Sequence, residues 1–174
     1  MEAGLALNGS TADSWHWVIR WTAKVSAVVF LVTFLASTIR RVWPRPWTGR
    51  LLRERRYWGL SFAGSQAIHL VAIWVGYRWF PSTMGPVNLM FWGGAIAYLF
   101  TALMAMTSSD RAIRWLGGKN WRRLHGTGMY VIWLTFAITY GANFSRDATH
   151  AVMTFVFPMA LAFKVAVKLR TRGQ

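Results

Sequence analysis

Five apolar segments separated by short polar connections constrain this chain more than any other feature. They run approximately over residues 21–39, 57–77, 86–107, 124–143 and 150–167. Each has roughly the 20 residues that a helix needs to cross the hydrocarbon core of a bilayer. Because a helix satisfies its own backbone hydrogen bonds inside lipid, the pattern predicts an all-α integral membrane protein, a bundle of about five transmembrane helices. The hydrophobic share of 55% fits such a lipid-facing surface.

The chain reads as one domain over residues 1–174, since no internal repeat, low-complexity stretch or long linker divides it. Residues 1–14 contain no Lys or Arg and no apolar stretch long enough for the core of a cleavable signal peptide. We therefore expect the first helix to be retained as a membrane anchor.

The basic residues fall in alternate connections. The first connection, the third connection and the carboxyl end hold Arg40, Arg41, Arg45, Arg50, Arg53, Arg55, Arg56, Arg111, Arg114, Lys119, Arg122, Arg123, Lys164, Lys168, Arg170 and Arg172. The opposite side holds Arg20, Lys24, Arg78 and Arg146. Because cytoplasmic loops are enriched in Lys and Arg, we expect the amino terminus outside and the carboxyl terminus in the cytoplasm.

The formal net charge of +15 raises the question of nucleic acid. The charges come in bursts between apolar runs and form no basic helix or stripe, so the expected partner is the lipid bilayer and not nucleic acid. Lys24 and Lys164 lie near the ends of their spans, where long side chains reach the headgroups. The same interface predicts an aromatic belt. Its expected members are Trp15, Trp17, Trp21, Trp43, Trp47, Tyr57, Trp58, Tyr77, Trp79, Trp115 and Trp121.

Metal chemistry in this chain must rest on histidine, because the absence of Cys excludes thiolate sites, iron–sulfur clusters and disulfides. His69 lies in the middle of the second span, about 20 Å of helical rise from Arg56. Its helix face carries Phe62, Ser65, Gln66, Ala72 and Gly76. Ionisable side chains inside a span mark functional sites. Two interpretations stay open on the residues alone: a haem ligand, or a hydrogen-bonded helix-packing residue.

His125 lies near the cytoplasmic end of the fourth span, directly after a basic run. The second and fourth spans run in the same direction, so His69 and His125 differ in depth by roughly 16 Å. Two axial ligands of one haem must lie at one level, and we therefore expect these histidines not to share a haem. His16 and His150 lie at the outer boundary and are predicted to be interfacial. No catalytic side-chain constellation is visible, which leaves any chemistry to a bound cofactor.

Four stretches carry a resemblance to a known family. They are Arg20-Trp21-Thr22 with Thr38-Ile39-Arg40-Arg41, Arg55-Arg56-Tyr57-Trp58-Gly59-Leu60, Thr107-Ser108-Ser109, and Arg114-Trp115-Leu116-Gly117 through Trp121-Arg122-Arg123-Leu124-His125. Over roughly residues 20 to 140 the chain resembles the ferric-reductase-like transmembrane family. Within that family it is most similar to the haem-binding membrane subunits of bacterial periplasmic methionine sulfoxide reductase systems.

The resemblance implies b-type haems stacked between the second and fourth spans. It makes His69 the ligand of an outer haem and His125 the ligand of an inner haem. Arg55 takes the place where some family members have a second inner histidine. Arg55, with Arg56, Arg122 and Arg123, is expected near the haem propionates, since guanidinium groups pair with carboxylates.

One departure stands out at Ile138, where family members carry a further histidine that serves the outer haem. Three alternatives stay open: the outer haem is five-coordinate on His69, another side chain replaces the ligand, or only an inner haem on His125 remains. The expected cofactor is therefore one or two haem b. His150 is a poor substitute, because it begins the fifth span at the outer edge.

The resemblance implies a membrane electron carrier of the bacterial inner membrane, an oxidoreductase subunit. It would take electrons on the cytoplasmic side from a separate reductase or from quinol, because the chain has no flavin domain, and deliver them to a periplasmic or extracellular acceptor. The alternative hypothesis is a degenerate, non-catalytic scaffold or binding subunit of the same fold, which Ile138 supports. A small transporter or sensor is disfavoured, since the spans contain no Asp or Glu.

Overall fold

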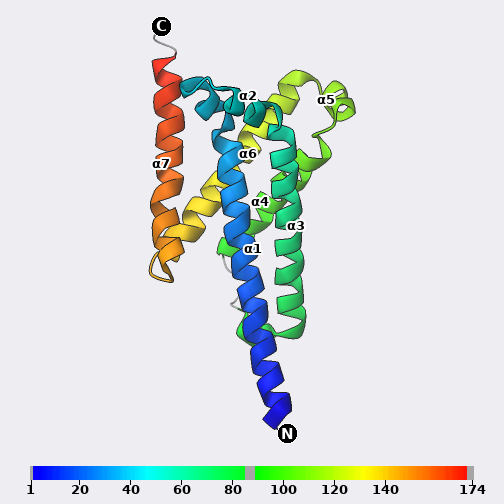
Figure 1. The fold of residues 1–174 in the computed structure, drawn as a ribbon. Coiled ribbons are helices and arrows are strands. Elements are labelled where there is room, and N and C mark those ends of the chain that lie inside the picture. Colours follow the sequence, from blue (N-terminus) through cyan, green and yellow to red (C-terminus); the bar gives the residue numbers. More distant parts are fainter. Residues whose placement is uncertain (1, 85–88, 172–174) are drawn as a thin grey trace.

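The computed structural model describes residues 2–84 and 89–171, and this part of the chain is all-helical, as predicted (Figure 1). Its elements are α1 (Glu2–Val42), α2 (Pro46–Arg53), α3 (Arg55–Trp79), a short 3₁₀ helix η1 (Pro81–Thr83), α4 (Leu89–Met106), α5 (Asp110–Leu116), α6 (Gly118–Ala142) and α7 (Ala148–Arg170). The predicted start of the third span, Pro86, lies outside the described residues. The short helices α2 and α5 within the basic connections were not predicted.

The chain is a multi-pass membrane protein. Among the described residues, three helical segments are long and apolar enough to cross a bilayer: Ser14–Val42, Arg55–Trp79 and Ala148–Arg170. Residues 90–106 and α5, bent by 105° where they meet, can form a fourth span. The predicted 124–143 span forms most of α6, which is 25 residues long. It is not among the spans identified by length and composition, because Gly, Thr and His residues lower its apolarity. Five spans therefore stay a prediction.

The long helices run alternately up and down, and this brings the basic connections to one end of the bundle (Figure 1). Helix α1 lies along α3, α4 packs on α6, and α6 packs on α7. Helices α2 and α5 and the end of α7 gather at one end, whereas η1 lies toward the opposite end. We call the end with α2 and α5 the basic end. Its gathering of positive charge is what the predicted orientation requires, and the orientation itself remains a prediction.

Local sequence signals explain where the helices begin. Ser109 caps α5 by accepting the Ala112 N–H at 3.1 Å, and Asp147 caps α7 by accepting the His150 N–H at 3.0 Å. Gly117 joins α5 to α6 with a φ of 74°, a left-handed conformation that favours glycine. This residue ends the Arg114-Trp115-Leu116-Gly117 stretch noted in the sequence. Helix α7 continues through Pro158.

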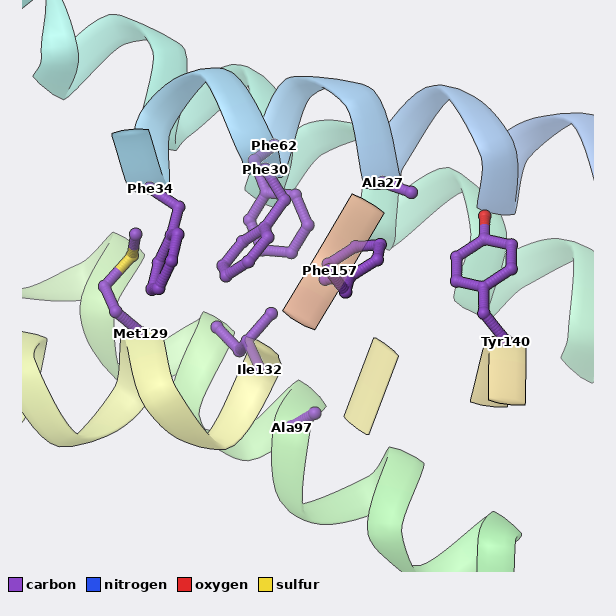
Figure 2. Close-up of a cluster of buried hydrophobic side chains, with 9 residues drawn as sticks. All are labelled: Ala27, Phe30, Phe34, Phe62, Ala97, Met129, Ile132, Tyr140 and Phe157. Atoms are coloured by element: carbon purple, nitrogen blue, oxygen red, sulfur yellow. The ribbon is translucent and has the colours of Figure 1, made fainter. Parts of the chain in front are cut away.

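A cluster of aromatic rings fills the middle of the bundle (Figure 2). Phe30 of α1 is fully buried, and the centroid of its ring lies 5.4 Å from that of Phe62 and 5.5 Å from that of Phe136. Phe157 of α7 is also fully buried, 5.3 Å from the Phe136 ring. The cluster therefore joins α1, α3, α6 and α7 by ring packing, which is a main source of helix association where lipid already solvates apolar surface.

Tryptophan does more than form an interfacial belt. Trp17 and Trp79 are 60% and 67% exposed, as a belt requires. In contrast, the Trp15 indole N–H donates to the Ala72 carbonyl of α3 at 2.8 Å, and the Trp121 indole N–H donates to the Thr107 carbonyl at 3.0 Å. Trp15 and Trp121 each tie their helix to another part of the bundle, and their place in an interfacial belt stays a prediction.

The lysines predicted to reach the headgroups instead bond to protein groups. Lys24 Nζ lies 3.3 Å from the Asp147 carboxylate and 3.1 Å from the Thr149 hydroxyl. Lys164 Nζ donates to the Phe34 carbonyl of α1 at 3.0 Å. The headgroup expectation fails because these spans pack closely against neighbours that offer acceptors, which satisfy an ammonium group within the bundle.

Asp147 links the start of α7 to α1, and its titration should be visible in the stability of the protein. The His150 imidazole at 3.0 Å, the His150 backbone N–H and Lys24 hold the pKa of Asp147 below its usual range. A carboxylate whose pKa is lower in the folded state than in the unfolded state stabilises the fold at pH values above the ordinary Asp pKa of about 3.9. This contribution is lost as the pH falls through the folded-state pKa. When the pH is lowered below about 4, we expect the unfolding temperature in detergent to decrease more for the wild type than for Asp147→Asn. The variant keeps a side chain that can cap the helix but carries no charge. Parallel curves for both proteins would contradict this prediction.

Candidate functional site

Two internal cavities lie one beyond the other along the bundle, and each contains one of the two predicted histidines. The inner cavity, toward the basic end, has a volume of about 650 Å³ and is lined by Arg55 and His125 among others. The outer cavity has a volume of about 520 Å³ and is lined by His69 among others. Thr101 of α4 and Ile132 of α6 line both. As expected, His69 and His125 are in positions where they do not serve one cofactor together.

His69 is held in the outer cavity by a hydroxyl of α1. Its Nδ1 lies 2.8 Å from Thr22 Oγ1, while that hydroxyl also donates to the Val18 carbonyl at 2.8 Å. When the hydroxyl hydrogen points to the backbone, Oγ1 accepts the Nδ1–H of the imidazole. Metal-ligating histidines typically donate their other ring N–H in this way, so the contact with Thr22 is compatible with a ligand role for His69.

His125 presents its ring differently in the inner cavity. Its Nε2 lies 3.1 Å from Thr107 Oγ1, and its ring stacks on Trp121 with centroids 4.2 Å apart. Ligation of iron through Nε2 therefore requires the Thr107 bond to open. The contacts with Thr107 and Trp121 orient the imidazole in the amino-terminal part of α6.

Two cations of the inner cavity bind consecutive carbonyl oxygens of α1. Arg55 Nε donates to the Thr33 carbonyl at 3.2 Å, and Lys164 Nζ donates to the Phe34 carbonyl at 3.0 Å. The Lys164 ammonium also lies 3.9 Å from the centroid of the Phe34 ring. Each group uses only some of its N–H donors in these bonds. The remaining donors can bind an anion in the cavity.

The charge of the inner cavity fits a ligand with carboxylates. Besides Arg55 and Lys164, its lining includes Arg53, Arg56 and Arg122. Asp110, the one acidic residue of the lining within the described part of the chain, pairs with Arg56 at 3.3 Å. Arg123, which was expected nearby, is not part of the lining. The positive charge that is left unpaired matches the two propionates of a haem, with a histidine nitrogen in the same cavity.

Lys164 was not predicted as a site residue, because its place near the end of a span suggested contact with the headgroups. A signal existed, since an ionisable residue within a span most often faces the bundle interior. Tyr98 was not predicted either, and Gln66 was expected only as a neighbour of His69. Tyr98 Oη and Gln66 Oε1 are buried, line the outer cavity and have no hydrogen-bond partner among the described residues.

Three further residues that the sequence singled out have defined positions. Ile138 is 53% exposed and is not part of the outer cavity wall, which α6 forms with Thr135, Phe136 and Thr139 among others. His16 lines the outer cavity, so its interfacial assignment was incomplete. His150 is buried against the Tyr140 ring, at 5.2 Å between centroids, and lines neither cavity. The turn before α7 packs His150 against α6, and its interfacial location stays a prediction.

Fold and cavities together define an all-helical, multi-pass membrane protein with two histidine-bearing cavities stacked inside the bundle. The chain is similar to the protein-methionine-sulfoxide reductase heme-binding subunit MsrQ of Azospira oryzae, with 28% identity over 151 residues. The match covers 82% of this chain and 62% of the relative. This distant homology confirms the resemblance recognised in the sequence. No family model matches the chain, and no solved structure matches it.

Proposed function

We propose that the chain is a haem b-binding membrane protein that passes electrons from a donor on the cytoplasmic side to an acceptor outside. The relative is named as a heme-binding subunit of a methionine sulfoxide reductase. In this proposal the chain crosses the bacterial inner membrane five times, with its amino terminus outside and the basic end in the cytoplasm. The donor is a separate reductase or quinol, and the acceptor is a periplasmic protein.

One observation carries the proposal: two adjoining cavities separate His125 from His69, and Thr101 and Ile132 line both. A stack of two redox cofactors needs such an arrangement, since cofactors in neighbouring cavities bring their edges close while each keeps its own ligand. The volumes, about 650 and 520 Å³, lie within the range of cofactor pockets.

Different residues of this chain would hold the two haems. His125 would hold iron in the inner cavity, where Arg55, Lys164 and Arg122 would bind propionates. His69 would hold iron in the outer cavity through Nε2, with its Nδ1 bonded to Thr22. A bound haem b supplies a one-electron iron couple. The protein would set the charge around it: among the described residues five cations line the inner cavity, and Arg146 is the one Lys or Arg on the outer wall.

The test is haem quantitation and a reduced-minus-oxidised spectrum of protein purified with haem supplied. We expect b-type absorbance bands and two haems per chain, falling to one in His125→Ala. His150→Gln is the matched control, because it changes a buried histidine outside both cavities and keeps the backbone N–H that bonds to Asp147. Monodisperse wild-type protein without b-type bands would refute the proposal and leave the non-catalytic scaffold as the better account.

A further inference from the structure

Two guanidinium groups, those of Arg40 and Arg53, come together over Gly49 at the basic end of the bundle. Arg53 Nη1 lies 3.6 Å and Arg40 Nη1 lies 3.8 Å from the position that a Cβ atom of residue 49 would take. In the described part of the chain, neither arginine makes an ion pair with an acidic side chain. Because like charges this close repel one another, the arrangement indicates an anion that both groups bind.

The Arg40 side chain is held in place for this role. Its Nη1 donates to the Arg45 carbonyl at 2.8 Å and lies 3.4 Å from the Thr48 hydroxyl. Thr48 is fully buried, and its hydroxyl lies 2.7 Å from the Trp43 carbonyl, a contact that fixes α2 on the end of α1. The bonds of Arg40 engage Nη1, so the donors on the other two nitrogens of its guanidinium can bind an anion.

The arginine pair lies at the edge of the inner cavity and is distinct from its wall. Arg53 lines that cavity, whereas Arg40 does not. Arg53 is exposed, and Arg40 and Gly49 are half-buried. An anion can therefore reach the pair from the surface of the basic end without entering the bundle.

Large apolar side chains are exposed close to the arginine pair. Trp43, Trp47 and Leu52 are 52%, 58% and 38% exposed. The Trp43 ring also packs on the Phe163 ring of α7, with centroids 6.2 Å apart. Helix α2 lies across the end of the long helices (Figure 1). A short helix with basic and apolar sides in this position is typical of a membrane interface, where tryptophan is enriched.

We propose that α2 and the end of α1 bind an anionic phospholipid, whose phosphate lies between Arg40 and Arg53 and whose acyl chains stay in the bilayer. The charge of the basic end favours such a ligand: its acidic residues, within the part of the chain that the structure describes, are Glu54 and Asp110, and Asp110 is paired with Arg56. The exposed indole rings favour a lipid over an acidic soluble protein, because tryptophan is enriched where acyl chains and headgroups meet. Basic clusters beside transmembrane helices recognise acidic headgroups by the same chemistry.

The probe is phosphatidylglycerol, titrated into the delipidated full-length protein in detergent. Native mass spectrometry counts the bound lipid, and the unfolding temperature is recorded in the same titration. We expect one tightly bound phosphatidylglycerol per chain and a higher unfolding temperature, because a ligand of the folded state stabilises it. Arg40→Gln and Arg53→Gln should each weaken binding about tenfold, since each removes charge-assisted hydrogen bonds to the phosphate. The matched control is Arg114→Gln, which removes an exposed arginine from α5 at the same end and should leave binding unchanged.

Gly49→Asp tests the same site by supplying the anion from the chain itself. A Cβ atom at this position meets both guanidinium groups at ordinary contact distances, so the side chain fits and its carboxylate lies between them. This variant should unfold at a higher temperature than the wild type without lipid, and phosphatidylglycerol should raise that temperature no further.

Three results would overturn the inference. Unchanged phosphatidylglycerol binding in Arg40→Gln and Arg53→Gln would leave the pair to another partner, such as an acidic protein. An equal loss in Arg114→Gln would reduce the effect to general charge attraction. Inorganic phosphate that stabilises the protein as much as phosphatidylglycerol at the same concentration would make this a site for a free anion. None of these results depends on the proposed function, because the lipid is counted by its own mass whether or not the chain holds haem.

Discussion

Replacement of His69 by alanine is expected to halve the haem content, from two haems per chain to one. The Nδ1 of His69 lies 2.8 Å from the Thr22 hydroxyl, and in the proposed function Nε2 of this residue would hold the iron of the outer haem. Alanine provides no iron ligand, and nothing on α6 at position 138 replaces it. The measurement is haem per chain by extraction, combined with the reduced-minus-oxidised spectrum of the same sample.

Two controls separate loss of the ligand from loss of the fold. His16→Ala removes a histidine from the same cavity, about 9 Å of rise away from Thr22, and should retain both haems. Added imidazole should restore haem to His69→Ala, because it fits the space that the side chain leaves. A normal haem content in His69→Ala would confine haem to His125 and contradict the two-haem arrangement.

Replacement of Phe30 by alanine is expected to destabilise the bundle by about 3 kcal/mol, a typical cost for a buried phenylalanine. Its ring is fully buried and packs against those of Phe34, Phe62 and Phe157, which Figure 2 shows, and against that of Phe136. In a membrane the loss is mainly one of packing, since the unfolded helices are already solvated by lipid. Thermal or denaturant unfolding in detergent measures it.

Val28→Ala is the matched control on the same helix. Val28 is 50% exposed, so its truncation should change the free energy of unfolding by no more than about 0.5 kcal/mol. Because Phe30 also lines the inner cavity, its variant should bind the inner haem less tightly. Equal unfolding midpoints for Phe30→Ala and the wild type would show that this ring cluster does not hold the helices together.

The helical architecture could be predicted because apolar length and backbone hydrogen bonding leave few alternatives in lipid. The placement of His69 and His125 in separate cavities followed from helical rise alone. Lys164, Tyr98 and Gln66 could not be placed in this way, because their roles depend on which helix each one faces. Length and composition support three or four of the five predicted spans, since α6 combines sufficient length with a polar composition.

The side chains of Thr101 and Ile132 have a consequence for the rate at which charge could move through the bundle. Since both border each cavity, the partition there is a single layer of side chains, and Ile132 is 2% exposed. Such a layer would keep two bound cofactors chemically separate and leave only a short distance for electron tunnelling. The rate of electron transfer between the two cavities would then depend on the size of the Thr101 and Ile132 side chains, neither of which is a proposed cofactor ligand.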